Sequence, residues 1–144
     1  MSAEERAHIV QEALSWQGTP YAHAGRIKGA GVDCGQFLLA VFEATGLVPH
    51  IEPDEYPPDW HCHRGEQRYL NHVEQHAHQI PGPPQPGDLV LYQFGRCISH
   101  GAIVVDWPVV IHSYVGLGVV LDDAVGNQAL ATRQKGFWSV WGDE

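Results

Sequence analysis

The sequence predicts an α+β domain in which helices come first and an antiparallel sheet follows. The best helical spacing of apolar residues lies before residue 46, and after a proline- and glycine-rich linker at 81–87 the pattern changes to short β-branched runs. The chain has 144 residues, of which 44% are hydrophobic. That is enough for one core, so we expect a single domain over residues 1–144.

Two helices are predicted near the start of the chain. Ser2 followed by Glu5 is typical of a capping box, and predicts a helix over residues 3–16. A second helix begins at Cys34 and should end before Gly46, because its apolar residues keep a spacing of three and four: Cys34, Phe37, Leu38, Val41 and Phe42. A weaker apolar face predicts a third helix over residues 64–78.

The second half of the chain predicts an antiparallel meander. Its strands are expected at 88–94, 98–105, 109–114 and 119–122, with an edge strand over 137–141.

Composition excludes several kinds of partner. The formal net charge is −9 and no cluster of Lys or Arg occurs, so neither nucleic acid nor a membrane is an expected partner. Ten histidines make this charge depend on pH. The acidic start has no apolar leader segment, and we expect synthesis and folding in the cytoplasm without a signal peptide. Three cysteines in such a chain predict at least one free thiol.

Cys34 is the candidate nucleophile. It follows a glycine-rich loop and opens the second helix, where unpaired N–H groups favour a thiolate. The alternative is that Cys34 is a small core residue, as cysteines on apolar helix faces usually are.

Two histidines are candidates for a general base and its orienting group. If Val105 pairs with Val109 across a three-residue loop, His100 and His112 share a face as diagonal neighbours about 7–8 Å apart. A shift of one residue would separate them. In this hypothesis His100 pairs with Cys34 as imidazolium and thiolate, and His112 holds the imidazole, although less strongly than a carboxylate would.

An oxyanion formed at Cys34 needs hydrogen-bond donors. The backbone N–H of Cys34 and the hydroxyl of Tyr21 are the candidates. Tyr21 has the alternative of packing its ring and bonding a carbonyl, and Asp33 is most simply the N-cap of the helix. Lone histidines on strands are also often structural residues.

At these residues the sequence resembles the NlpC-type cysteine peptidases, which are papain-like endopeptidases of bacterial cell-wall peptides. The motifs that carry the resemblance are Gly18-Thr19-Pro20-Tyr21, Val32-Asp33-Cys34-Gly35, Pro86-Gly87-Asp88-Leu89-Val90, Ser99-His100-Gly101-Ala102-Ile103 and Ile111-His112-Ser113.

The resemblance implies a papain-like fold and a catalytic set of Cys34, His100 and His112. It places Tyr21 beside the nucleophile, and we assign Tyr21, Asp33, Gly35 and Ser99 to the oxyanion and substrate-binding site. The implied reaction is hydrolysis of the bond between D-γ-glutamyl and a diamino acid in peptidoglycan stem peptides, through an acyl-enzyme and without a cofactor.

Two departures from the family pattern bear on function. The usual Asp-Cys-Ser-Gly reads Asp33-Cys34-Gly35-Gln36, and a His- and Pro-rich insertion occupies about residues 47–82. The insertion and the absence of a leader resemble short phage-tail and prophage members, which a virion carries to the wall and which contact other tail proteins. A non-catalytic tail component that keeps the fold is the alternative function.

The insertion also suggests a weaker alternative, a zinc-binding module. Its potential ligands are His61, Cys62, His63, His72, His76 and His78. Their spacing matches no structural zinc signature, so we predict no metal site.

Overall fold

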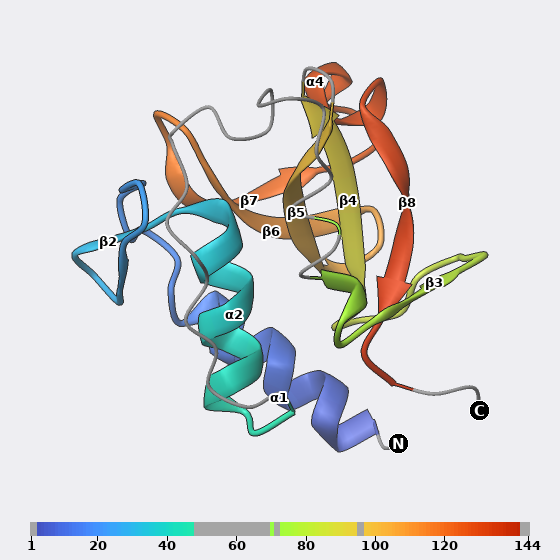
Figure 1. The fold of residues 1–144 in the computed structure, drawn as a ribbon, viewed down its shortest axis with the longest axis horizontal. Helices are drawn as coiled ribbons and strands as arrows, with labels where there is room; N and C mark the ends of the chain where they lie inside the picture. The colour runs from blue at the N-terminus through green and yellow to red at the C-terminus, as the bar shows by residue number, and fades with distance from the viewer. Residues whose placement is uncertain (1–2, 48–69, 71–72, 95–96, 142–144) are drawn as a thin grey trace.

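The computed structural model describes residues 3–47, 70, 73–94 and 97–141, and it confirms the α+β class. Two N-terminal helices lie on one side of a twisted antiparallel sheet (Figure 1). The elements are α1 Ala3–Leu14, β1 Arg26–Ile27, β2 Gly31–Val32, α2 Cys34–Ala44, β3 His78–Ile80, β4 Leu89–Phe94, β5 Cys97–Asp106, β6 Val109–Tyr114, β7 Gly118–Asp123, α4 Gln128–Ala131 and β8 Gln134–Ser139.

Both predicted N-terminal helices are confirmed, and local chemistry sets the ends of α2. Asp33 is its N-cap, and Gly46 follows the C-cap in a left-handed conformation with φ +79. The N–H of Gly46 donates to Glu43 O at 3.1 Å and that of Leu47 to Phe42 O at 3.1 Å, which satisfies two terminal carbonyls. Among the described residues, no helix has both the length and the apolar character needed to cross a membrane.

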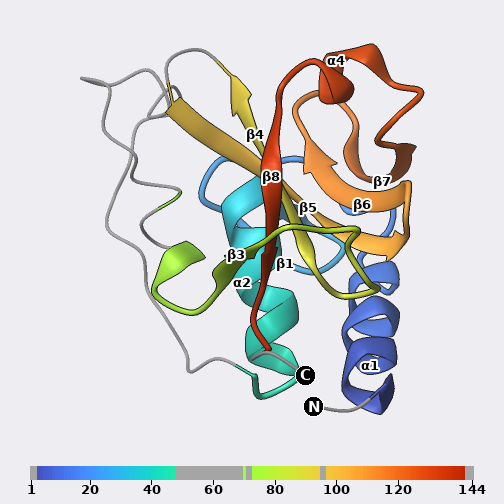
Figure 2. The same ribbon diagram turned by 90° about the vertical axis from the view of Figure 1, so that its right-hand side faces the viewer.

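The sheet has the strand order β3-β8-β4-β5-β6-β7. The strands β4, β5, β6 and β7 were predicted within one or two residues, but the expected edge strand over 137–141 is wrong in both place and extent. This segment is β8, which begins at Gln134 and lies between β3 and β4 (Figure 1). Figure 2 shows the same sheet from the side on which β8 lies in front. Among the described strands the two edges are β3, a short strand that pairs with β8, and β7.

The third predicted helix, over 64–78, lies mostly outside the described residues. Its described part is helical at Leu70, Val73 and Glu74, but His78 is not helical because it begins β3 and pairs with Ser139. The prediction is therefore wrong at its C-terminal end. Local helical spacing is a weak signal here, and pairing of residues 78–80 with the distant strand β8 outweighs it.

The two faces of the sheet bury two separate cores. Successive residues of a strand point to opposite faces, so neighbours such as Ile103 and Val104 contribute to different cores. The core under the helices includes Ile9, Ala13, Phe37, Val41, Leu91, Ile103, Ile111 and Trp138. The other core contains Val90, Tyr92, Ala102, Val104, Val110, Ala124 and Leu130.

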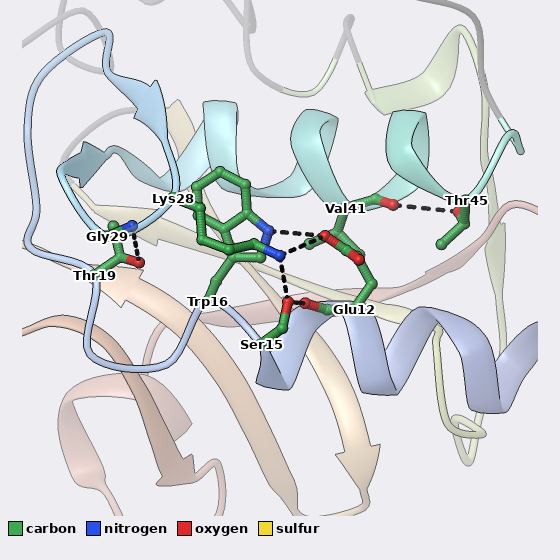
Figure 3. Close-up of polar contacts among 8 residues, drawn as sticks. All are labelled: Glu12, Ser15, Trp16, Thr19, Lys28, Gly29, Val41 and Thr45. Carbon is green, nitrogen blue, oxygen red and sulfur yellow. Dashed lines mark hydrogen bonds and ion pairs between the residues drawn. The ribbon is translucent and has the colours of Figure 1, made fainter.

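Polar contacts fasten the β1–β2 hairpin to the end of α1 (Figure 3). Lys28 Nζ donates to Ser15 Oγ at 2.6 Å and lies 3.2 Å from Glu12 Oε2. The N–H of Gly29 donates to Thr19 Oγ1 at 3.0 Å. These contacts hold the loop that leads the chain into α2.

The segment before Tyr21 lies against the edge strand β7. The N–H of Gly18 donates to Val119 O at 2.9 Å, and the N–H of Val119 donates to Thr19 O at 2.9 Å. Gly118 packs so closely that a Cβ there would lie 2.3 Å from Thr19 O. The residues just before Tyr21 are therefore held against β7 by backbone hydrogen bonds, which fixes where Tyr21 lies.

Candidate active site

Cys34 is the first residue of α2, as the sequence predicts, and Asp33 organises the turn before it. Asp33 Oδ1 accepts from the N–H of Gln36 at 2.8 Å, and Oδ2 accepts from the N–H of Ala24 at 2.7 Å. The second bond ties the glycine-rich loop to the helix. Asp33 is thus an N-cap that also fixes the approach to Cys34, and Gly35 continues the first helical turn with part of its surface exposed.

The thiol of Cys34 meets strand β5 at Ser99. Sγ lies 3.4 Å from Ser99 O, and the Cys34 residue is 8% exposed. The Ser99 hydroxyl is directed elsewhere, 3.4 Å from Phe94 O, so the contact at the thiol is made by the Ser99 carbonyl. His100 is the next residue along the strand.

A β-bulge accounts for this placement of Ser99. Gln93 pairs with Ile98 and Tyr92 pairs with His100, so Ser99 is an extra residue without a partner in the ladder. Bulges redirect side chains and are common beside functional sites. Nothing in the residue pattern of this segment indicated the bulge.

His100 and His112 are joined directly by a hydrogen bond. Nε2 of His100 lies 2.8 Å from Nδ1 of His112, and the two residues are 6% and 0% exposed. Three aromatic rings surround His100, with centroids 5.5–5.8 Å away, and belong to Tyr92, Phe94 and Tyr114. These rings shield the histidine pair from water.

The predicted register that brings the histidines together is confirmed. Ile103 pairs with Ile111 and Val104 with Val110, as that register requires. The predicted pairing of Val105 with Val109 is wrong, because Val109 pairs with Asp106. An irregularity at the end of the hairpin absorbs this one-residue difference and does not reach the histidines.

A carboxylate that the sequence analysis missed lies behind His112. Asp122 Oδ2 is 3.1 Å from His112 Nε2 and accepts a second hydrogen bond, at 2.9 Å, from Asn127 Nδ2. The signal for Asp122 was present in the short loop between Tyr114 and Gly118. That loop sets a register in which His112 pairs with Val120, and Asp122, two residues further along the strand, is then a diagonal neighbour of His112.

Burial keeps both histidines neutral in the resting protein. The pKa of His100 is lowered well below its ordinary value, first by burial and then by the neighbouring His112. Burial also lowers the pKa of His112, against the opposing effects of the charge and hydrogen bond of Asp122. Burial thus favours a neutral imidazole on His100 at rest, and the pairing of His100 with Cys34 as imidazolium and thiolate stays a prediction.

A short backbone pairing joins Tyr21 to Val32, two residues before Cys34. Tyr21 forms a parallel bridge with Val32, whose N–H donates to Pro20 O at 3.0 Å and whose carbonyl accepts from Ser113 Oγ at 2.7 Å. Burial raises the pKa of the Tyr21 hydroxyl, and negative charge on Cys34 and on Asp33 raises it further. Tyr21 therefore keeps its proton and stays a hydrogen-bond donor.

Tyr92 carries an unusual buried hydroxyl. Within the described ranges its Oη has no hydrogen-bond partner, although the residue is fully buried. Burial raises the pKa of Tyr92, and the charge of Asp122 contributes. The hydroxyl is thus within electrostatic reach of the carboxylate behind His112.

The zinc alternative stays a prediction, because four of its six potential ligands lie outside the described residues. Among the described residues, no group of three potential metal ligands occurs. His76 and His78 are described, whereas His61, Cys62, His63 and His72 lie outside the described residues.

The fold and this arrangement together define a papain-like α+β domain with a cysteine at the start of its core helix. The sequence profile of the NlpC/P60 family matches residues 18–138. The chain belongs to the NlpC/P60 family. No curated protein sequence matches it significantly.

Solved structures of low sequence identity share the fold. A Staphylococcus aureus protein described as similar to a lipoprotein of the NLP/P60 family superposes with a TM-score of 0.69 at 19% identity, over 99% of this chain and 43% of its own. The NlpC/p60 domain of the peptidoglycan hydrolase SagA gives 0.59 at 22% identity, over 92% and 96%.

A third similar structure is described as non-catalytic. RipD from Mycobacterium tuberculosis, a non-catalytic NlpC/p60 domain adapted to peptidoglycan binding, gives a TM-score of 0.60 at 15% identity, over 95% of this chain and 97% of its own. This chain spans less than half the length of the S. aureus protein. Family membership therefore indicates a cell-wall peptidase-like domain, and activity has to be argued from the site.

Proposed function

We propose that the protein is a cysteine peptidase that hydrolyses peptidoglycan stem peptides between D-γ-glutamyl and a diamino acid. The observation that carries the proposal is the 2.8 Å contact between His100 and His112. His100 directly follows Ser99, whose carbonyl oxygen accepts from Cys34 Sγ. A nucleophile, a base and an orienting group in this order form the set that acyl transfer through a thiol requires. The choice of bond rests on the family.

Acylation begins with a proton transfer. Because Nε2 of His100 is engaged by His112, Nδ1 is the nitrogen that takes the proton from the Cys34 thiol. The sulfur then attacks the γ-carbonyl carbon of D-glutamate, and the carbonyl oxygen becomes an oxyanion. When the C–N bond breaks, the leaving amine takes the proton from His100, and a thioester remains on Cys34.

Deacylation reverses the proton path. His100 Nδ1 accepts a proton from water as the hydroxide oxygen attacks the thioester carbon. The C–S bond breaks, the γ-carboxyl product leaves, and the proton returns to the sulfur. The thiol and the neutral imidazole are restored.

Two donors are positioned to stabilise the oxyanion in this proposal. The Cys34 N–H lies in the first turn of α2, at the residue whose sulfur attacks the carbonyl. The second donor is the Tyr21 hydroxyl, which stays protonated beside the nucleophile. In this proposal Asp33 holds the start of α2 and Ser99 contacts the thiol through its carbonyl. Gly35, which is partly exposed and has no side chain, leaves room for substrate beside Cys34.

A non-catalytic wall-binding domain is the competing function, because one similar structure is described in those terms. The retention of Cys34 with two hydrogen-bonded histidines supports catalysis, since binding alone requires no nucleophile and base. For the route to the wall, we propose delivery by a phage tail or prophage virion. This rests on the resemblance alone, and mass spectrometry of purified virions tests it.

The experiment that tests the function incubates the protein with a synthetic L-Ala-γ-D-Glu-diaminopimelate peptide and identifies the products by mass spectrometry. We expect cleavage after D-Glu, and a rate lower by roughly 10⁴–10⁶-fold in Cys34→Ala and His100→Gln. His8→Gln, an exposed change on α1, is the matched control and should retain the rate. Binding of the peptide without cleavage by the unaltered protein would support the non-catalytic function.

A further inference from the structure

We propose that Asp122 is a positioning residue that sets the tautomers of both His112 and His100, so that Nδ1 of His100 carries no proton and is ready to accept one. This inference rests on the proposed function for its catalytic meaning. Its structural content, the placement of two protons, can be measured without turnover.

The carboxylate of Asp122 determines which nitrogen of His112 carries the proton. An ionised carboxylate only accepts hydrogen bonds, so the 3.1 Å contact between Asp122 Oδ2 and His112 Nε2 requires the proton to be on Nε2. A neutral histidine has one N–H, and His112 is neutral because burial lowers its pKa. Nδ1 of His112 is then a lone-pair acceptor.

The proton position on His112 in turn determines the proton position on His100. Nδ1 of His112 accepts, so His100 must donate from Nε2 across the 2.8 Å contact. His100 is also neutral, which leaves its Nδ1 without a proton. One carboxylate therefore orders both protons and directs the free lone pair of His100 away from His112.

Asn127 holds the carboxylate in place. Its Oδ1 accepts from the N–H of Ala129 at 3.0 Å, which identifies the other amide atom, Nδ2, as the donor to Asp122 at 2.9 Å. The N–H of Asp123 donates to Asp122 Oδ1 at 2.8 Å. Both oxygens of Asp122 are thus engaged, and Oδ2 is held toward His112.

The helix α4 gives this arrangement a rigid base. Asn127 is its N-cap, and Leu130 anchors the helix in the core on that face of the sheet. Asp122 itself lies on β7, next to the strand that carries His112. The chain therefore supplies the carboxylate, its clamp and both histidines from neighbouring elements.

The test replaces the carboxylate with a group of the same shape that can also donate. Asp122→Asn is made together with Asn127→Asp, because Oδ2 of Asp122 accepts two hydrogen bonds and Oδ1 accepts one, so in the single variant the amide oxygen would stay toward His112. This double variant is called Asp122→Asn below. With a carboxylate at position 127, the amide nitrogen at position 122 faces that carboxylate and also donates to His112 Nε2, which moves the proton of His112 to Nδ1. His112 then donates to His100 Nε2, and the proton of His100 moves to Nδ1, where it blocks the base. Asp123→Asn is the matched control, because it removes an exposed carboxylate of the same strand that contacts neither histidine.

The first readout is the ¹⁵N NMR spectrum of protein labelled at histidine, which distinguishes protonated from unprotonated ring nitrogens. We expect protonated Nε2 and unprotonated Nδ1 on both His100 and His112 in the unaltered protein and in Asp123→Asn. We expect the opposite pattern in Asp122→Asn. Protonated Nδ1 on His100 in the unaltered protein would overturn the proposal even if the variant failed to fold.

The second readout is stem-peptide turnover. We expect kcat to fall roughly 10²–10⁴-fold in Asp122→Asn with little change in KM, as for a base held in the wrong tautomer. Unchanged kcat and unchanged tautomers in a folded Asp122→Asn would overturn the inference. Inverted tautomers in the variant, with no turnover by the unaltered protein, would support the role of Asp122 and refute the proposed function.

Discussion

Nε2 of His100 and Nδ1 of His112 lie 2.8 Å apart inside the protein, within a ring of aromatic side chains. The contact joins two strands whose register keeps both imidazoles on one face. Burial disfavours a positive charge on either ring and so favours the neutral form of both histidines at rest.

This neutrality predicts that stability falls in mild acid. Because the pKa of each histidine is lower in the folded state, the unfolded chain binds protons first as the pH drops below the ordinary value. Each histidine then costs about 1.4 kcal/mol per pH unit below roughly 6.5, until its folded pKa is reached. Urea unfolding at pH 7.5 and pH 5.5 measures the loss.

The control for this acid effect is His8→Gln, which should keep the full difference between the two pH values. His112→Gln should show a smaller difference, since one buried titrating group is gone. An equal loss in all three proteins would show that the acid sensitivity arises elsewhere.

The Tyr92 hydroxyl has no hydrogen-bond partner among the described residues, and this predicts a substitution that does not destabilise the protein. A buried hydroxyl without a partner carries a desolvation cost of about 1–3 kcal/mol, and Tyr92→Phe removes it while keeping the ring. We expect the free energy of unfolding to stay the same or to rise by about 1 kcal/mol. A clear loss of stability in urea unfolding would show that the hydroxyl has a partner in solution.

Two substitutions of Asp33 should lower the free energy of unfolding by different amounts. Asp33→Ala removes the acceptors of two N–H groups, on Ala24 and Gln36, and should cost about 2–4 kcal/mol from a lost cap and a buried unpaired donor. Asp33→Asn keeps one acceptor and should cost less. Chemical unfolding gives both values, and an equal cost would mean that only one of the two bonds matters.

A side chain at Gly118 should clash with the backbone of Thr19, and a comparison with Gly116 separates this clash from backbone strain. Gly118 and Gly116 lie in the same turn with φ +77 and +85, but only at Gly118 would a Cβ meet a backbone atom, Thr19 O. Gly118→Ala should therefore lower stability by about 1–3 kcal/mol more than Gly116→Ala, which carries backbone strain alone. Thermal unfolding of the two variants gives the difference, and equal melting temperatures would contradict the close packing.

Local signals predicted much of this molecule. The N-cap at Asp33, the apolar stripe behind it and Gly46 placed α2 at Cys34–Ala44, because capping and periodicity act over a few residues. The β-branched runs around His100 and His112 gave the register of the histidine pair. In that hairpin, loop length and alternation restrict the choices to very few.

The rest depends on contacts between distant parts of the chain. β3 and the interior position of β8 exist through pairing with each other, which residue patterns along a short strand do not reveal. The Ser99 bulge that brings β5 to the thiol has no signature in its residues. Asp122 was accessible in principle, because the same register reasoning applied to the β6–β7 hairpin places it diagonal to His112.

The rate of Cys34 alkylation by iodoacetamide, measured from pH 5 to pH 9 in the unaltered protein and in His100→Gln, shows whether His100 activates Cys34. If His100 activates Cys34, the unaltered protein reacts quickly well below pH 8, and the variant reacts only as the thiol ionises at higher pH. A slow reaction with the same ordinary thiol profile in both proteins would contradict an activated nucleophile.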